Sequence, residues 1–169
     1  MPIELTTPLS EETIASLNVG DMVYISGDIL CGRDAVLPKV AEMLENGTVS
    51  QLGVDLQGSV MFHTAVSPAG VGPTSSNKAE IEASIAPLSA GGVKLHLGKG
   101  ALSGKTIAAL NEHNSVYAVI PPVTALLGQL TVSQRTVAFS DLGMEALHML
   151  TVRRYPAIIA AAKGRSIYE

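Results

Sequence analysis

Short apolar runs alternate with amphipathic segments through most of this chain of 169 residues. The apolar runs have the length and the β-branched content of buried strands. They cover residues 22–30, 59–66, 93–97, 116–120, 136–139, 146–152 and 157–162. The segments with apolar residues at helical spacing predict helices over residues 10–17, 34–45, 78–88, 104–113 and 123–130.

Polar caps, a proline and a glycine set the ends of the first two helices. Ser10 begins the first, and the two glutamates that follow suit its first turn. Asp34 is a candidate cap for the second helix, but Pro38 is tolerated only in a first turn, so the start can shift to Leu37. Gly47 is expected to end that helix.

The order of these elements predicts an α/β fold. Strands and helices alternate in the middle of the chain, which implies right-handed crossovers and a partly parallel sheet. The early and late strands have no helices between them and are expected to add antiparallel pairs. The run over 59–66 alternates so well that we expect one strand with Val60, Phe62, Thr64 and Val66 on one side. With no repeat and no linker, residues 1–169 are predicted to form a single domain.

Composition changes this picture in one respect, which is the surface. Hydrophobic residues make up 47% of the chain and charged residues only 15%, and the mean hydropathy is +0.33. We therefore expect part of the surface to be covered by a partner or by a second copy. The net charge of −4 argues against nucleic acid, because no basic stripe is present to neutralise phosphates.

Cysteine usage and the N-terminus bear on location. Cys31 is the only cysteine, so this chain has neither a disulfide framework nor a cysteine-based metal site of its own. The first twelve residues carry acids and prolines instead of a basic and then apolar signal. Residues 115–134 are uncharged but interrupted by prolines and glycine, so no membrane span is expected. We predict a cytoplasmic protein.

Residues 68–78, PAGVGPTSSNK, gather a large share of the polar chemistry. Glycines and a proline that disfavour regular structure precede Thr74, Ser75 and further polar residues, and Lys78 ends the stretch. Hydroxyls beside free backbone N–H groups before a helix can cradle an anion. A plain helix cap is the alternative reading of the same residues.

A second glycine loop, LHLGKGALSGKT over residues 95–106, resembles a phosphate-binding loop. That motif has four residues between its first glycine and the glycine of Gly-Lys-Thr. Gly98 is one residue too far from Gly104 and Gly100 one too near, which disfavours a nucleotide site. Lys99 nevertheless follows a strand of the predicted parallel sheet, where α/β proteins bind ligands. A solvated loop cation is the other interpretation of this lysine.

Other polar residues are weaker candidates. Arg33 follows a strand and either clamps a carboxylate or pairs with neighbouring Asp34. Asp141 is interpreted as a turn or helix cap. The four histidines lack metal-ligand spacing, and His63 and His96, inside apolar strands, are expected to be core or interface residues rather than metal ligands. Cys31 is expected to be a small, buried apolar residue.

Four spaced elements together resemble the β-subunit, or C-terminal domain, of class I fumarases and L-tartrate dehydratases. They are GRDAVLPK (32–39), GVGPTSS (70–76), LGKG (97–100) and DLGMEALHMLTVRRYPAI (141–158). The similarity runs in order from about Leu5 to Ile159. The resemblance implies a three-layer swivelling β/β/α domain. It also implies a companion α-subunit that binds a [4Fe–4S] cluster through three cysteines, with the active site between the two parts.

The same resemblance assigns roles to individual residues. Thr74 corresponds to the base that moves a proton of the substrate. Arg33 and Lys99 would bind the carboxylates of a small hydroxy-dicarboxylate, and Ser75 and Lys78 are further substrate-binding candidates. Lys78 stands where the family usually has an arginine, which removes a bidentate fork. A non-catalytic, anion-binding or regulatory relative of the same fold is the alternative function.

Overall fold

The computed structural model describes residues 2–67, 70–74, 78–120 and 124–168, with the backbone alone for residues 70–74, 78, 80, 124 and 125. The helices are α1 (Glu11–Ala15), α2 (Leu37–Asn46), α3 (Lys78–Ala90), α4 (Gly104–Glu112), α5 (Thr124–Gln129) and the 3-10 turns η1 (Val49–Leu52) and η2 (Ser140–Glu145). The strands are β1 (Ile3–Thr6), β2 (Met22–Cys31), β3 (Ser59–Phe62), β4 (Thr64–Ser67), β5 (Gly70–Thr74), β6 (Val93–Gly98), β7 (Val116–Val119), β8 (Thr131–Ala138), β9 (Leu147–Ala162) and β10 (Arg165–Ser166).

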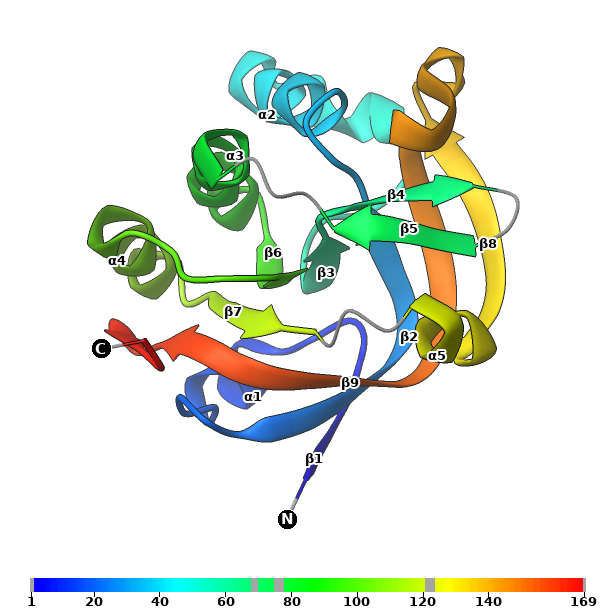
Figure 1. Ribbon diagram of the computed structural model, residues 1–169. Coiled ribbons are helices and arrows are strands. Elements are labelled where there is room, and N and C mark those ends of the chain that lie inside the picture. The colour runs from blue at the N-terminus through cyan, green and yellow to red at the C-terminus, as the bar shows by residue number, and fades with distance from the viewer. Residues whose placement is uncertain (1, 68–69, 75–77, 121–123, 169) are drawn as a thin grey trace.

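Most strands form one mixed sheet (Figure 1). In the described part of the chain it has eight strands in the order β1-β2-β3-β6-β7-β9-β10, with β8 paired to β9. Neighbours from β1 to β7 are parallel, whereas β9 is antiparallel to β2, β7 and β8. The predicted α/β fold with a mixed, partly parallel sheet is confirmed, and β2 and β9 form the expected antiparallel pairing of an early with a late strand. Strand β1, which was not predicted, pairs in parallel with β2.

The long strand β9 closes the sheet on itself. It pairs with both β2 and β7, so β2, β3, β6, β7 and β9 form a ring. The ring encloses the largest hydrophobic cluster, which includes Ile25, Phe62, Leu97 and Tyr155. Helices α2, α3 and α4 lie side by side on the outside of this ring (Figure 1), with α3 against β6 and α4 against β7 and β9. Two facing layers of strands under one layer of helices agree with the expected β/β/α layering.

Local chemistry explains where the helices start and stop. The Ser10 side chain accepts a hydrogen bond from the Thr13 N–H and caps α1, as predicted. Helix α2 begins at Leu37 and not at Asp34, because Pro38 is confined to the first turn. Gly47 ends α2 in the left-handed region with φ of 73°, where glycine costs least.

Two predictions around residues 59–74 are wrong. The run over 59–66 is divided at His63 into β3, which belongs to the main sheet, and β4, which belongs to a second sheet. Both faces of these strands are buried, so alternation along the sequence carries no information about a solvent side. Residues 70–74, expected to be irregular, form β5, which pairs antiparallel with β4.

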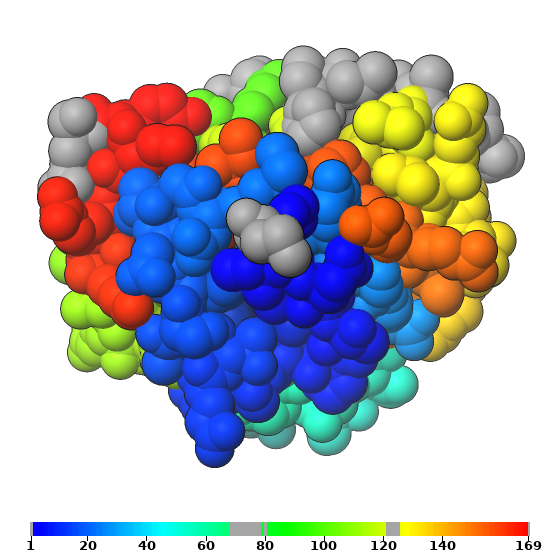
Figure 2. Space-filling view, turned by 90° about the horizontal axis from the view of Figure 1, so that it is seen from below, coloured from blue at the N-terminus to red at the C-terminus, as the bar shows by residue number. Residues whose placement is uncertain are grey.

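The last third of the chain also differs from expectation. Strand β8 begins at Thr131, five residues before its predicted start, and its exposed middle hides it from a search for apolar runs. Strand β9 is continuous across Pro156, although two separate runs were expected. Seen from below, the N-terminal segment covers the centre of the lower face, with β8 at one side (Figure 2). None of the described helices has the length and apolarity needed to cross a membrane.

Candidate active site

The carboxyl ends of three parallel strands meet at one edge of the sheet. The Gly32 N–H, after β2, donates to the Phe62 carbonyl at the end of β3, at 3.0 Å. The His63 N–H donates in turn to the Leu97 carbonyl in β6, at 3.1 Å. Neighbouring strands lie about 4.8 Å apart, so the chains leaving β2 and β6 are separated by about 10 Å. Ligands of α/β proteins bind at such strand ends.

Arg33 lies at the β2 end of this edge. Its side chain is 26% exposed, and its Nε lies 3.6 Å from Oε2 of Glu145 on η2. Arg33 was predicted from sequence as a carboxylate-binding residue, whereas Glu145 was not recognised. An ion pair between distant segments leaves no local signal in the sequence. Only the position of Glu145 within the run over 141–158 could therefore point to it.

The turn that carries Glu145 is fixed by a histidine from β9. Nε2 of His148 lies 3.2 Å from the Gly143 carbonyl and must carry the proton, because a carbonyl only accepts. Nδ1 then accepts from the Thr136 hydroxyl at 3.3 Å. Gly143 has φ of 60° and ψ of −122°, a conformation available mainly to glycine. Asp141 lies in the first turn of η2, but the N-cap position is Phe139 and has no side-chain cap hydrogen bond, so Asp141 is not the cap of this turn.

The β4–β5 hairpin brings the candidate base to the same edge. Thr74 ends β5, and its Cα pairs with that of Thr64, the residue directly after His63. Gln134 of β8 donates from Nε2 to the Ser67 carbonyl at 2.7 Å and ties the hairpin to β8. For Thr74 the backbone alone is described, so the role predicted for its hydroxyl stays a prediction.

Two further predicted residues belong to the same part of the chain. Lys78 begins α3, and its side chain lies outside what the structure describes. Ser75 lies outside the described residues. Their predicted contacts with substrate carboxylates therefore remain predictions.

Lys99 lies at the β6 end of the edge, where it was expected. Its side chain is exposed, while the backbone on both sides of it is fixed. The Ile120 N–H donates to the Gly98 carbonyl at 3.1 Å, and the Tyr117 hydroxyl donates to the Gly100 carbonyl at 3.0 Å. Burial raises the pKa of Tyr117, with smaller contributions from Tyr168 and Glu82, so this hydroxyl keeps its proton.

The glycine loop after Lys99 does not have the geometry of a nucleotide site. The Glu82 carboxylate of α3 accepts hydrogen bonds from the Ser103 N–H, the Ser103 hydroxyl and the Thr106 hydroxyl. These groups form the N-terminus of α4, which Ser103 also caps. A phosphate would have to occupy the position that Glu82 already fills, which agrees with the misfit of the sequence motif.

Beneath the strand ends lies a buried chain of polar side chains. His63 Nε2 lies 3.1 Å from His96 Nδ1, and His96 Nε2 lies 2.9 Å from the Ser89 hydroxyl. Burial lowers the pKa of His63 to about 4. Burial, and then the neighbouring His63, hold the pKa of His96 well below its ordinary value. Both rings are therefore neutral near pH 7, and their predicted place in the core is confirmed.

The residues present do not fit an iron–sulfur cluster. Among the described residues there is no group of three His, Cys, Asp or Glu side chains placed to hold a metal ion. Cys31 is fully buried, and burial raises the pKa of its thiol far above the ordinary value, which disfavours the thiolate that metals need.

Comparison with known proteins gives this arrangement a family. The family model described as Fumarase C-terminus matches residues 1–169. A putative L(+)-tartrate dehydratase subunit beta from Methanocaldococcus jannaschii is 30% identical over 95% of this chain and 88% of its own length. The L(+)-tartrate dehydratase subunit beta of Escherichia coli is 27% identical over 93% of this chain and 81% of its own length.

Fumarate hydratases are related over a smaller part of their length. A putative class I fumarate hydratase from Geobacillus stearothermophilus is 29% identical over 99% of this chain. The chain spans about one third (34%) of that protein but most of each tartrate dehydratase β-subunit. The chain belongs to the family of the fumarase C-terminal domain, which includes the β-subunits of L(+)-tartrate dehydratases.

Proposed function

We propose that this chain is the β-subunit of an iron–sulfur hydro-lyase. The enzyme would reversibly hydrate or dehydrate a small hydroxy-dicarboxylate of the fumarate/malate or tartrate class. The observation that supports this most is the meeting of three loops at one sheet edge, where β2 leads to Arg33, β6 leads to Lys99 and the hairpin ends at Thr74. Strand ends about 10 Å apart suit long cationic side chains that reach toward one small dianion.

The chemistry gives each residue a task. In dehydration, a base takes the proton from the carbon next to a carboxylate, and the electron pair left behind forms the double bond as hydroxide leaves the neighbouring carbon. Negative charge builds up on that carboxylate, so nearby cations stabilise the transition state. We assign this contribution to Arg33, Lys99 and Lys78, with Ser75 as a hydrogen-bond donor. Thr74 would be the base, and only such a cationic setting can lower the pKa of its hydroxyl enough.

The cluster and the rest of the site would come from an α-subunit. Support comes from the single, buried cysteine of this chain and from relatives that are named as β-subunits. The low share of charged residues, 15%, favours a covered surface and a larger assembly. The purified chain alone is expected to be inactive and to gain activity with its partner. Robust fumarate hydration by the iron-free chain alone would contradict this proposal.

Thr74→Ala tests the proposed base. In the complex with the α-subunit, turnover should fall by about 100-fold or more, the range typical of a lost acid–base group. Thr74→Ser should recover part of the rate, because it restores the hydroxyl. The matched control is Thr6→Ala, an exposed threonine of β1. The melting temperature is measured on the same samples.

A stability loss of about 1 kcal/mol with intact turnover would reduce Thr74 to a helix cap. A complex that binds the dicarboxylate but shows no turnover in the unaltered protein would favour the alternative function, a non-catalytic binding relative.

A further inference from the structure

The most specific sequence element of this chain, residues 141–158, has no role in the chemistry proposed above. It forms η2 and most of β9, and none of the proposed catalytic or binding residues belongs to it. It meets the strand-end site at the ion pair between Glu145 and Arg33. We propose that Glu145 is a positioning residue that holds the Arg33 guanidinium in one orientation for a substrate carboxylate. This inference rests on the proposed function of Arg33.

The geometry of the pair supports this role. Nε of Arg33 is inaccessible to solvent although 26% of the side chain is exposed, so the guanidinium turns one edge inward. Glu145 lies on that inward edge, at 3.6 Å. At 3.6 Å the contact between Glu145 and Nε is an ion pair and not a hydrogen bond. Because the guanidinium is planar and has donors on more than one edge, an attraction at its Nε edge favours one direction for the other donors.

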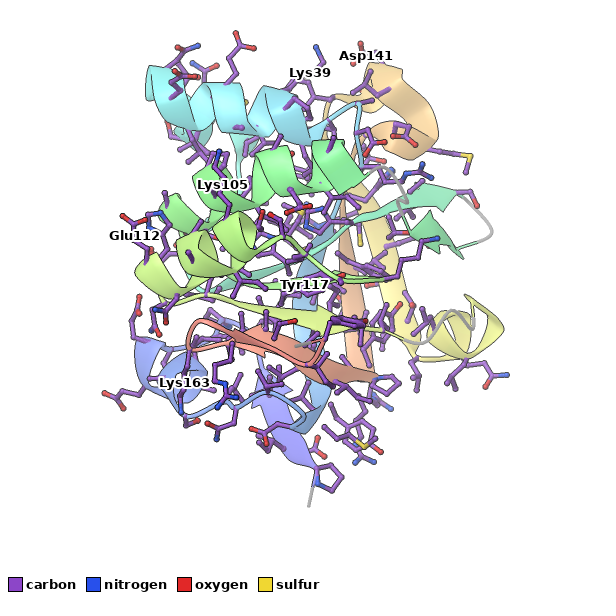
Figure 3. The ribbon with its side chains drawn as sticks, turned by 60° about the vertical axis from the view of Figure 1, so that its left-hand side comes forward. Lys39, Lys105, Glu112, Tyr117, Asp141 and Lys163 are labelled. Carbon is purple, nitrogen blue, oxygen red and sulfur yellow. The ribbon has the colours of Figure 1, made fainter. Side chains whose placement is uncertain are left out.

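The segment that carries Glu145 packs against the start of α2. Phe139 and Leu142 pack against a hydrophobic cluster that also contains Val36 and Leu37, which follow Arg33 in the chain. Lys39 of α2 lies over the Phe139 ring, 6.0 Å from its centre. Figure 3 accordingly shows the start of α2 and η2 next to each other, marked by Lys39 and Asp141.

His148 connects the same turn to the strand that leads to Arg33. It pairs in register with Cys31, and its Nε2–H binds the Gly143 carbonyl of η2. The two ends of the ion pair are therefore attached to the same neighbouring strands, β2 and β9. Any movement of Glu145 relative to Arg33 would require these strands or the shared cluster to move.

Two effects of Glu145 on substrate binding oppose each other. Its negative charge weakens the attraction of Arg33 for a dianion, but both groups are partly exposed and this effect is screened. Without Glu145, a long and flexible arginine would have to be ordered when substrate binds, which costs conformational entropy. We expect the second effect to be larger, so that loss of Glu145 weakens binding.

Glu145→Gln in the complex with the α-subunit tests this inference. KM for the dicarboxylate should rise about fivefold to tenfold, while kcat changes by less than about twofold. Glu145→Asp keeps the charge but shortens the side chain. Its KM should lie between those of the unaltered protein and Glu145→Gln. Glu42→Gln, at an exposed position of α2, is the control for a simple change in net charge.

A double-mutant cycle with Arg33→Lys separates positioning from a general structural effect. If Glu145 acts through Arg33, Glu145→Gln should change KM by less than about twofold in the Arg33→Lys background. A second readout is the Arg33 Nε–H resonance of the isotope-labelled chain. It should be sharp in the unaltered protein and broadened in Glu145→Gln, with the fold intact.

The outcomes distinguish this inference from the proposed function. An unchanged or lowered KM in Glu145→Gln, with a raised KM in Arg33→Lys, would overturn the positioning role and leave Arg33 as a binding residue. An unchanged KM in Arg33→Lys would instead overturn the proposed function of Arg33. Equal effects of Glu145→Gln and Glu42→Gln would show that net charge alone is at work and would also overturn the inference.

Discussion

Two neighbouring polar clusters of this molecule differ in charge and in burial. At the strand ends, Arg33 and Glu145 carry full charges and keep 26% and 34% of their side chains exposed. In the interior beneath the strand ends, His63 and His96 are at most 1% exposed and form a neutral hydrogen-bonded chain with Ser89. In this comparison the charged pair stays where water can still solvate it, while the buried imidazoles are neutral and bind each other and Ser89.

This difference predicts that one cluster serves stability and the other serves substrate binding. Changes in the buried chain should lower stability and leave substrate binding intact, whereas changes at the strand ends should do the opposite. The four expectations below test that division, from the largest effect to the smallest.

Removal of the central imidazole should have the largest effect. His96→Ala leaves a cavity and deprives both His63 and Ser89 of a hydrogen-bond partner. We expect the free energy of unfolding to fall by about 3 kcal/mol, measured by denaturant unfolding, with kcat per folded complex unchanged within about twofold. His113→Ala, at a half-buried position, is the control. A large loss of kcat at normal stability would place the buried chain in the catalytic chemistry.

Arg33→Lys should show the reverse pattern. Lysine keeps the charge but loses the planar fork, and a charged hydrogen bond is worth about 1.5–3 kcal/mol. KM for the dicarboxylate should therefore rise about 10- to 100-fold at nearly unchanged stability. The exposed Arg153 supplies the matched control, Arg153→Lys. A loss of stability without a change of KM would make Arg33 a structural residue.

Acid should destabilise the buried chain selectively. The folded-state pKa of His63, about 4, is below its ordinary value of 6.5, so the unfolded chain binds protons more readily. Stability is complete above pH 6.5 and falls as the pH is lowered toward 4, by at most about 1.4 kcal/mol per pH unit for each imidazole. His63→Gln should flatten this decline and Arg33→Lys should not. If the free energy of unfolding of the unaltered protein, His63→Gln and Arg33→Lys falls in parallel as the pH is lowered, His63 is not responsible for the loss of stability.

Lys99→Arg should have the smallest effect. The side chain is exposed and only the backbone around it is fixed, so a longer cation can be accommodated. We expect KM to change by less than about threefold in steady-state kinetics. A change of KM as large as that of Arg33→Lys would mean that the Lys99 side chain is held as tightly as that of Arg33, and would contradict this expectation.

Much of the scaffold could be predicted from local signals in the sequence. Ser10, Pro38 and Gly47 act through the backbone next to them, and the helix boundaries that they predict are close to those observed. The strand ends at Gly32 and Gly98 could be predicted for the same reason, and with them the places of Arg33 and Lys99.

Features that depend on distant partners could not be predicted. The division at His63 reflects burial of β3 and β4 on both faces, and β8 is a strand because β9 lies beside it, although its own middle residues are exposed. The ion pair of Glu145 with Arg33 joins two segments that come together only in the folded sheet. Family resemblance pointed to residues 141–158 but gave Glu145 no function.

The position of β9 has a consequence for how this chain is made. β9 closes the ring by pairing Met22 with Ile158 and Cys31 with His148, which brings together opposite ends of the chain. Such pairings fold slowly, because a long loop must close first. During synthesis, β2 and β7 keep open edges until residues 147–162 have left the ribosome, and open edges pair with other chains. Synthesis of β9 therefore determines when the open strand edges of this domain are covered and protected from proteases and from aggregation with neighbouring chains.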